Sequence, residues 1–161
     1  MKIRYHSAVL RHDTGLHPES VSRIEAFGPL DAEPLALDAE VWLPLVHDLE
    51  YIEKVRMHSA AGLPLDPDTV VSGGSYEAAC VAVGLAIQAM NTGDFALVRP
   101  PGHHAYRNEA RGFCLFNNVA VAAAKAVAEG KRVLILDFDG HLGDGTMSIF
   151  YDSDQVFYWS L

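Results

Sequence analysis

The 161-residue sequence is poor in cysteine and in positive charge. Its two cysteines, Cys80 and Cys114, lack the spacing of a metal-binding pair, so we expect buried reduced thiols rather than a disulfide. Lysine and arginine number 12 against 21 aspartates and glutamates, which gives a formal net charge of -9. Such an acidic balance opposes binding to nucleic acid and favours a neutral or cationic small substrate.

Long apolar runs are also missing. The longest apolar stretches, over 81–90 and 119–127, contain small or polar residues and are too short to cross a bilayer. The residues after Met1 contain no apolar segment of the kind found in secretory signals. We therefore expect a cytoplasmic protein that binds no membrane. Since no internal repeat or linker divides the chain, residues 1–161 are expected to form one domain that represents part of a larger pattern.

Helices and strands alternate along the second half of the sequence. Strands joined by helices predict βαβ crossovers and an α/β fold with a parallel sheet. Glycine and asparagine mark where these elements begin and end. The expected elements are a short helix over 50–58, a helix over 75–90 capped by Ser75 and stopped near Gly93, a short buried strand over 95–99, a helix from Asn117 or Asn118 to Gly130, and strands over 132–136 and 156–161. The run over 132–136 is apolar almost throughout, which predicts a central strand covered on both faces.

A motif with possible metal ligands follows the strand over 132–136. In extended chain, Asp137, Asp139 and His141 point to the same side because side chains alternate. Aspartate oxygens and imidazole nitrogens bind zinc, and a catalytic zinc takes three protein ligands and a water molecule. Asp139 and His141 are therefore candidate zinc ligands, with Asp137 behind them. The alternatives are a strand-end site for Mg²⁺ and phosphate, or a simple turn cap.

Two adjacent histidines, His103 and His104, lie in a Pro-Pro-Gly turn after the strand over 95–99. Neighbouring imidazoles can act as a base and an acid when carboxylates orient them. Asp137 and Asp144 are available for this, each orienting one histidine. The alternative is that both histidines merely pack in a tight turn. Because ligands gather at the carboxyl ends of parallel strands, we expect this turn and the metal motif to meet.

The segment over 136–140 also resembles the nucleophile motif of the haloacid dehalogenase-like phosphatases. In that family the first aspartate, here Asp137, attacks phosphorus, and the second, here Asp139, serves as acid and base. His141 stands where that family has threonine, and most of that fold would have to follow the motif. This alternative predicts Mg²⁺-dependent release of phosphate.

Several segments together resemble the zinc-dependent histone deacetylase superfamily, which includes bacterial deacetylase-like amidohydrolases and acetylpolyamine amidohydrolases. They cover residues 15–19, 71–79, 99–105, 112–120 and 137–146. The resemblance implies an arginase/deacetylase-type α/β fold, represented by roughly its N-terminal half. It also implies hydrolysis of acetyl-lysine or acetylpolyamine amides by zinc-activated water.

The resemblance further implies a role for each matching residue. His103 and His104 would be the acid/base pair, oriented by Asp137 and Asp144 respectively. Gly112 and Phe113 would line the tunnel for the acylated amine, although both would also suit an ordinary apolar turn. The zinc ligands would be Asp139 and His141, and a structural K⁺ ion would be held by Asp137, Asp139, the backbone around His141, Ser160 and Leu161.

The sequence departs from the family pattern in several ways. Family members supply a third zinc ligand and a carbonyl-polarising tyrosine from segments beyond His141, and neither has a match here. Leu142 replaces a usual histidine, and Gly140 replaces a bulkier apolar residue. We expect little or no deacetylase activity from the chain alone unless a partner or a surplus histidine completes the site. The surplus histidines are His6, His12 and His17. Asp152 and Asp154 lie too close to His141 in the sequence to be the third zinc ligand, and Tyr151 and Tyr158 lie too close to it to be the carbonyl-polarising tyrosine.

The strand over 156–161 is expected to leave a sheet edge and apolar faces exposed. Surfaces of this kind favour association, so we expect a homo-oligomer that forms through the sheet. The alternative to an impaired enzyme is a non-catalytic half-fold that acts as an interaction module and keeps the potassium site.

Overall fold

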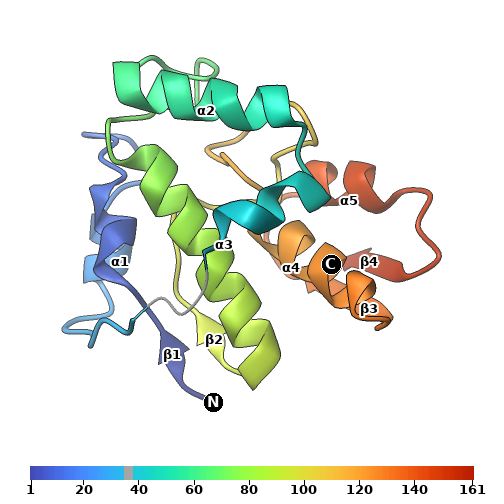
Figure 1. Ribbon diagram of the computed structural model, residues 1–161. Helices are drawn as coiled ribbons and strands as arrows, with labels where there is room; N and C mark the ends of the chain where they lie inside the picture. The colour runs from blue at the N-terminus through green and yellow to red at the C-terminus, as the bar shows by residue number, and fades with distance from the viewer. Residues whose placement is uncertain (35–37) are drawn as a thin grey trace.

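A computed structural model describes residues 1–34 and 38–161 of the chain and confirms the α/β class with parallel strands. Its strands form two parallel pairs, β1 with β2 and β3 with β4 (Figure 1). The elements in chain order are β1 (Ile3–Arg4), the 3-10 helix η1 (Ser7–Arg11), α1 (Ser22–Glu25), the 3-10 helix η2 (Glu40–Leu45), α2 (Leu49–Ala61), α3 (Ser75–Thr92), β2 (Phe95–Ala96), α4 (Asn118–Ala128), β3 (Val133–Asp137), α5 (Asp144–Phe150) and β4 (Val156–Ser160).

Helix α3 runs through the middle of the molecule in Figure 1 and packs against η1, β2 and α4. It ends at Gly93, which adopts the left-handed conformation with φ of 68°, as predicted. The prediction that Ser75 is the N-cap is wrong, because Gly74 holds that position. Ser75 is instead the first helical residue, and its hydroxyl accepts a hydrogen bond from the backbone N–H of Ser72 over 2.8 Å.

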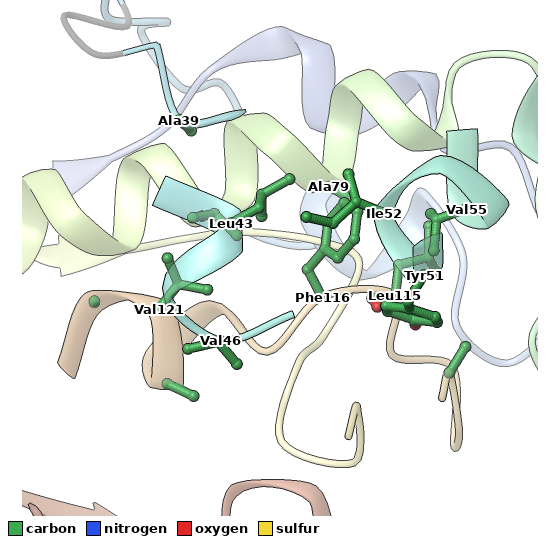
Figure 2. Close-up of a cluster of buried hydrophobic side chains, with 14 of the residues drawn as sticks. Ala39, Leu43, Val46, Tyr51, Ile52, Val55, Ala79, Leu115, Phe116 and Val121 are labelled. Atoms are coloured by element: carbon green, nitrogen blue, oxygen red, sulfur yellow. The ribbon is translucent and has the colours of Figure 1, made fainter. Parts of the chain in front are cut away.

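The main hydrophobic core lies between η2, α2, α3 and α4 (Figure 2). Phe116 is fully buried at its centre, with the rings of Tyr51 and Tyr76 packed edge-on at 6.2 and 5.9 Å between ring centroids. The hydroxyl of Tyr51 donates to the backbone carbonyl of Leu115 over 2.6 Å, which satisfies a polar group that burial would otherwise penalise. This core fixes the segment that leads into α4.

The helix predictions are confirmed for α2 and α4. The side chain of Asn117 accepts a hydrogen bond from the backbone N–H of Ala120 over 3.1 Å, so Asn117, one of two candidates, caps α4. Gly130 follows that helix with φ of 80°. Helix α2 extends beyond the predicted 50–58, and it stops at Gly62.

The strand predicted over 95–99 is shorter and less buried than expected. Only Phe95 and Ala96 form β2, and the Phe95 side chain is exposed because this strand lies at the surface. Strand β2 pairs with β1, in the register Ile3 opposite Phe95. Two-residue strands have no periodicity that sequence analysis could detect.

Strand β3 is covered on one face only within the described residues. Ile135 is buried with Val156 and with Ala123 of α4. Leu134 and Leu136, which point the other way, are 61% and 52% exposed. The prediction that β3 is covered on both faces is therefore wrong for the described part of the chain, because no helix lies over its second face.

Both cysteines are free thiols, as predicted, and burial raises the pKa of each to about 12. Among the described residues, no helix combines the length and apolar character needed to span a membrane.

Candidate active site

The turn over 99–105 carries the two adjacent histidines and is held tightly against the start of α4. A Cβ atom at Gly102 would lie 2.6 Å from the backbone nitrogen of Asn118, so only glycine allows this approach. Asn118 donates a side-chain hydrogen bond to the carbonyl of Pro100 over 3.1 Å. These contacts fix the backbone that bears His103 and His104.

The structure places each histidine beside the carboxylate expected from the sequence. Nδ1 of His103 lies 3.0 Å from Oδ2 of Asp137, and Nδ1 of His104 lies 2.6 Å from Oδ1 of Asp144. The two imidazole rings are 4.1 Å apart between centroids and tilted by 48°. Both His–Asp units therefore converge at the carboxyl end of β3.

Tyr158 completes the surroundings of Asp137, although sequence analysis gave it no role. Its hydroxyl donates to Oδ2 of Asp137 over 2.8 Å and accepts from the backbone N–H of Gly143 over 2.9 Å. Partial burial raises the pKa of Asp137, but hydrogen bonds from Tyr158 and His103 outweigh burial, so this pKa lies below its usual value. Tyr158 lies opposite Ile135 in the β3–β4 pair. Because every second side chain of a strand points to the same face, Tyr158 shares a face with Ile135 and Asp137. The sequence alone does not give the strand register that this argument needs.

Asp144 lies at the start of α5 and has a second set of partners. The hydroxyl of Tyr106 donates to its Oδ2 over 3.0 Å, and a guanidinium nitrogen of Arg111 lies 3.3 Å from the same oxygen. Burial raises the pKa of Asp144, but the hydrogen bonds from His104 and Tyr106 prevail and lower it. Sequence analysis missed Tyr106 and Arg111, which come from the loop between β2 and α4.

Asp139 and His141 lie in the exposed loop after β3. Oδ1 of Asp139 accepts a hydrogen bond from the backbone N–H of His141 over 2.9 Å and lies 3.2 Å from its Nδ1. The backbone hydrogen bond from His141 is the main cause that lowers the pKa of Asp139. The ring of His141 is 6.1 Å from that of His104, which brings these ligand candidates to the histidine pair.

No cluster of three or more metal-ligating side chains occurs in residues 1–34 and 38–161. The surplus histidines do not supply a third ligand. His12 is buried and contacts Ser75 and Glu19, and His6 accepts a hydrogen bond from the backbone N–H of Ala8. His17 packs edge-on against Phe113, with 4.6 Å between the ring centroids.

Gly112 lies directly beside His104, and Phe113 follows it in the chain. A Cβ atom at Gly112 would come within 2.6 Å of the His104 ring, so the glycine allows the backbone to lie close to the imidazole. Phe113 has φ of 72°, which is rare for a residue with a side chain. Its backbone N–H donates to the hydroxyl of Thr69 over 3.3 Å, which supports this conformation.

The pairing of β3 with β4 places Asp137 opposite Ser160. The backbone N–H of Leu161 donates to the carbonyl of Asp137 over 3.0 Å. The carboxyl ends of both strands therefore lie side by side.

Two His–Asp units at the carboxyl end of a parallel strand pair define an α/β fold of the deacetylase type. Residues 8–161 match the histone deacetylase domain model, and the chain belongs to this family. This assignment favours the amidohydrolase interpretation of the Asp-Phe-Asp motif over the dehalogenase-like one.

Individual relatives agree with the assignment. The chain is 40% identical to the "Histone deacetylase-like amidohydrolase" of Pseudomonas aeruginosa, over 88% of this chain and 39% of that protein. It is 36% identical to the uncharacterized protein slr0245 of Synechocystis, over 99% of this chain and 60% of that protein. The crystal structure of the HDA15 HD domain superposes with a TM-score of 0.88 and 35% identity, covering 99% of this chain and 54% of that chain. The chain thus spans about half the length of these relatives and represents the N-terminal part of the fold.

Proposed function

We propose that this chain carries the acid/base half of a zinc amidohydrolase site that acts on acetylated amines such as acetyl-lysine or acetylpolyamines. The observation that carries the proposal is the pair of His–Asp units, whose imidazole rings lie 4.1 Å apart. One histidine alone could serve as a structural turn residue. Two neighbouring histidines, each held through Nδ1 by its own carboxylate, are suited to moving two protons in one reaction.

In this proposal the carboxylates hold Nδ1 of each ring in its protonated form, which leaves Nε2 free to exchange protons. One histidine accepts a proton from the attacking water, and the other donates a proton to the leaving amine nitrogen. Asp137 and Asp144 have lowered pKa values, so both remain ionised at neutral pH and stabilise a positive charge on the adjacent ring. General acid and base catalysis of this kind contributes about 10²- to 10⁴-fold to a rate.

The donor chemistry of the loop after β3 fits zinc in part. Asp139 and His141 would provide an oxygen and a nitrogen ligand, and the side chain of His141 is exposed, so a metal ion could reach it. A catalytic zinc requires one more protein ligand, which would come from outside the described residues. When bound, zinc lowers the pKa of its water ligand and polarises a carbonyl group.

Gly112 and Phe113 are proposed to form one wall of the tunnel for the acylated amine, because Gly112 lies against His104 and Phe113 is the next residue. For K⁺ we propose the oxygen atoms of Asp137, Asp139 and Ser160 together with the backbone around His141 and Leu161. The chain alone is expected to hydrolyse acetyl amides very slowly, since the part of it that the structure describes offers no third zinc ligand beside Asp139 and His141, and no residue matches the family's carbonyl-polarising tyrosine. Loss of one such donor typically lowers the rate by about 10²-fold or more.

The proposal is tested by zinc binding to the purified chain, measured by equilibrium dialysis with metal analysis. We expect weak zinc binding that His141→Ala and Asp139→Asn each abolish. His58→Ala is the matched control, because His58 lies on α2 and its ring hydrogen-bonds only to the carbonyl of Pro64 among the described residues. Equal zinc binding by the chain and by both loop variants would contradict the proposed ligands.

A further inference from the structure

The carbonyl groups of His103 and Ala105 lie on either side of His104 in the chain, and other elements bind both of them. The backbone N–H of Thr146 donates to the carbonyl of His103 over 3.0 Å. The side-chain amide of Asn117 donates to the carbonyl of Ala105 over 3.1 Å. The amide also donates to Oγ1 of Thr146 over 3.0 Å, and both side chains are fully buried. The histidine turn therefore rests on the Asn117–Thr146 pair.

Asn117 makes contacts that the cap of α4 does not require. Capping uses its Oδ1, which accepts from the backbone N–H of Ala120. Aspartate and serine cap helices equally well. Asparagine differs from them by its Nδ2 group, which has two N–H donors, and here the donors bond to Ala105 and Thr146. The choice of asparagine at this position therefore fits its contacts with the histidine turn as well as the helix end.

His47 holds Asn117 through the backbone. Its Nε2 accepts from the N–H of Asn117 over 3.0 Å, and its Nδ1 lies 3.2 Å from the carbonyl of Arg107. A neutral ring with its proton on Nδ1 satisfies both contacts. Burial lowers the pKa of His47 to about 4, so the ring is neutral at pH 7 and accepts at Nε2. Asn117 is thus fixed by its backbone as well as by its side chain.

Helix α5 contacts the histidine turn through three consecutive residues. Asp144, its first residue, faces Nδ1 of His104 over 2.6 Å. Gly145 packs on the backbone, where a Cβ atom would lie 2.6 Å from the carbonyl carbon of His104. Thr146 then binds the carbonyl of His103. The His104 ring and the backbone that carries it are therefore held by the same turn of helix, which sets the angle between the ring and Asp144.

We propose that Asn117 and Thr146 are positioning residues, which hold the histidine turn so that His104 presents Nδ1 to Asp144. They act on the ring through the backbone carbonyls on either side of it. The proposal deepens the proposed function and rests on it, because the angle of a ring matters most when the ring transfers protons. Misplacement of a reacting group by about 1 Å can lower a rate about 10²-fold.

The test measures which ring nitrogen of His104 carries the proton, by nitrogen-15 NMR of the chain alone. The quantity compared is the ratio of the Nδ1-protonated to the Nε2-protonated form of the neutral ring. It is measured without zinc or substrate, so a failure of zinc binding would contradict the proposed function alone. Thr146→Val removes the hydroxyl, Thr146→Ser keeps it, and Asn117→Asp removes the Nδ2 donors but keeps the capping oxygen.

Thr92→Val is the matched control for loss of a threonine hydroxyl. The Thr92 hydroxyl contacts the carbonyl of Gln88 and the carboxylate of Asp94 at the exposed end of α3, away from the histidine turn. Urea denaturation of every variant shows that it folds. A purely structural role of Thr146 would lower the unfolding free energy, as in Thr92→Val, without changing the ratio at His104.

We expect Thr146→Val and Asn117→Asp each to lower the ratio at His104 about 2- to 10-fold, which is the effect of one lost hydrogen bond. Thr146→Ser and Thr92→Val should leave it unchanged. An unchanged ratio in either folded variant of the pair would overturn the proposal. An equal change in Thr146→Ser or in Thr92→Val would overturn it as well, because the hydroxyl at position 146 would then not be the cause.

Discussion

The hydroxyl of Tyr158 donates a hydrogen bond to Oδ2 of Asp137 over 2.8 Å, across the β3–β4 pair. The same oxygen faces Nδ1 of His103. Tyr158 thereby links the second strand of the pair to the histidine turn, although the two are more than fifty residues apart in the sequence. The orientation of His103 therefore depends on strand pairing as well as on its own turn.

Tyr158→Phe removes this donor and leaves the N–H of Gly143 without the hydroxyl that accepts from it. We expect the pKa of Asp137 to rise toward its usual value and the free energy of unfolding to fall by about 1 kcal/mol. Carboxyl-carbon NMR titration and urea denaturation measure the two effects. Tyr151→Phe, at a highly exposed tyrosine, is the control. An unchanged titration of Asp137 in Tyr158→Phe would contradict the assigned link.

The histidine and aspartate pairs could be predicted from the sequence because each lies in a local motif whose spacing reflects its chemistry. The α4 cap at Asn117 and the stop at Gly93 were equally local. Tyr158 and Tyr106 could not be found this way, since their roles depend on the register of two strands and on the path of a long loop. The prediction that both faces of β3 are covered was wrong for a related reason: an apolar strand favours burial of both faces, but its sequence does not show which residues would cover them.

Arg99 and Glu19 form a buried ion pair with two hydrogen bonds of 2.9 Å each. Arg99→Ala leaves the Glu19 carboxylate without its main counter-charge, so we expect a loss of about 3 to 5 kcal/mol in unfolding free energy. Arg11→Ala is the matched control, because the pair of Arg11 with Glu77 is exposed and should contribute less than about 1 kcal/mol. Urea denaturation distinguishes the two, and equal losses would refute the contrast.

His47 is buried, and burial lowers its pKa to about 4. In the unfolded chain the ring binds a proton near its usual pKa of 6.5, so stability is fully present above that pH and falls as the pH drops toward 4. The full loss is about 3 kcal/mol. Unfolding free energies measured at pH 7, 6 and 5 should show this slope in the natural chain and a shallower one in His47→Gln. Identical slopes would show that another group titrates.

Glu19 titrates in a lower window, which separates its effect from that of His47. Burial raises the pKa of Glu19, but hydrogen bonds from His12 and Arg99 prevail and lower it to about 2. Its contribution to stability is present above the usual pKa of 4.5 and disappears as the pH falls toward 2. Glu19→Gln should therefore flatten the stability profile below pH 4.5 and leave the slope between pH 7 and 5 intact.

Gly102→Ala places a Cβ atom 2.6 Å from the backbone nitrogen of Asn118 and 2.9 Å from the carbonyl oxygen of Phe116. Neither backbone atom can move freely, so we expect a loss of about 1 to 3 kcal/mol and altered imidazole NMR signals from His103. Gly73→Ala, where a Cβ meets open space, should change both measurements little. Similar effects at the two glycines would argue against the close packing of the histidine turn.

The most direct test of the account is the rate of acetyl-lysine peptide hydrolysis by a hybrid enzyme. In this hybrid, the present chain replaces the matching part of the Pseudomonas aeruginosa amidohydrolase, to which it is 40% identical. We predict zinc-dependent hydrolysis that falls about 10²- to 10⁴-fold in His104→Ala while the zinc content stays the same. A folded, zinc-loaded hybrid that does not hydrolyse the peptide, or that keeps its full rate in His104→Ala, would contradict the central claim.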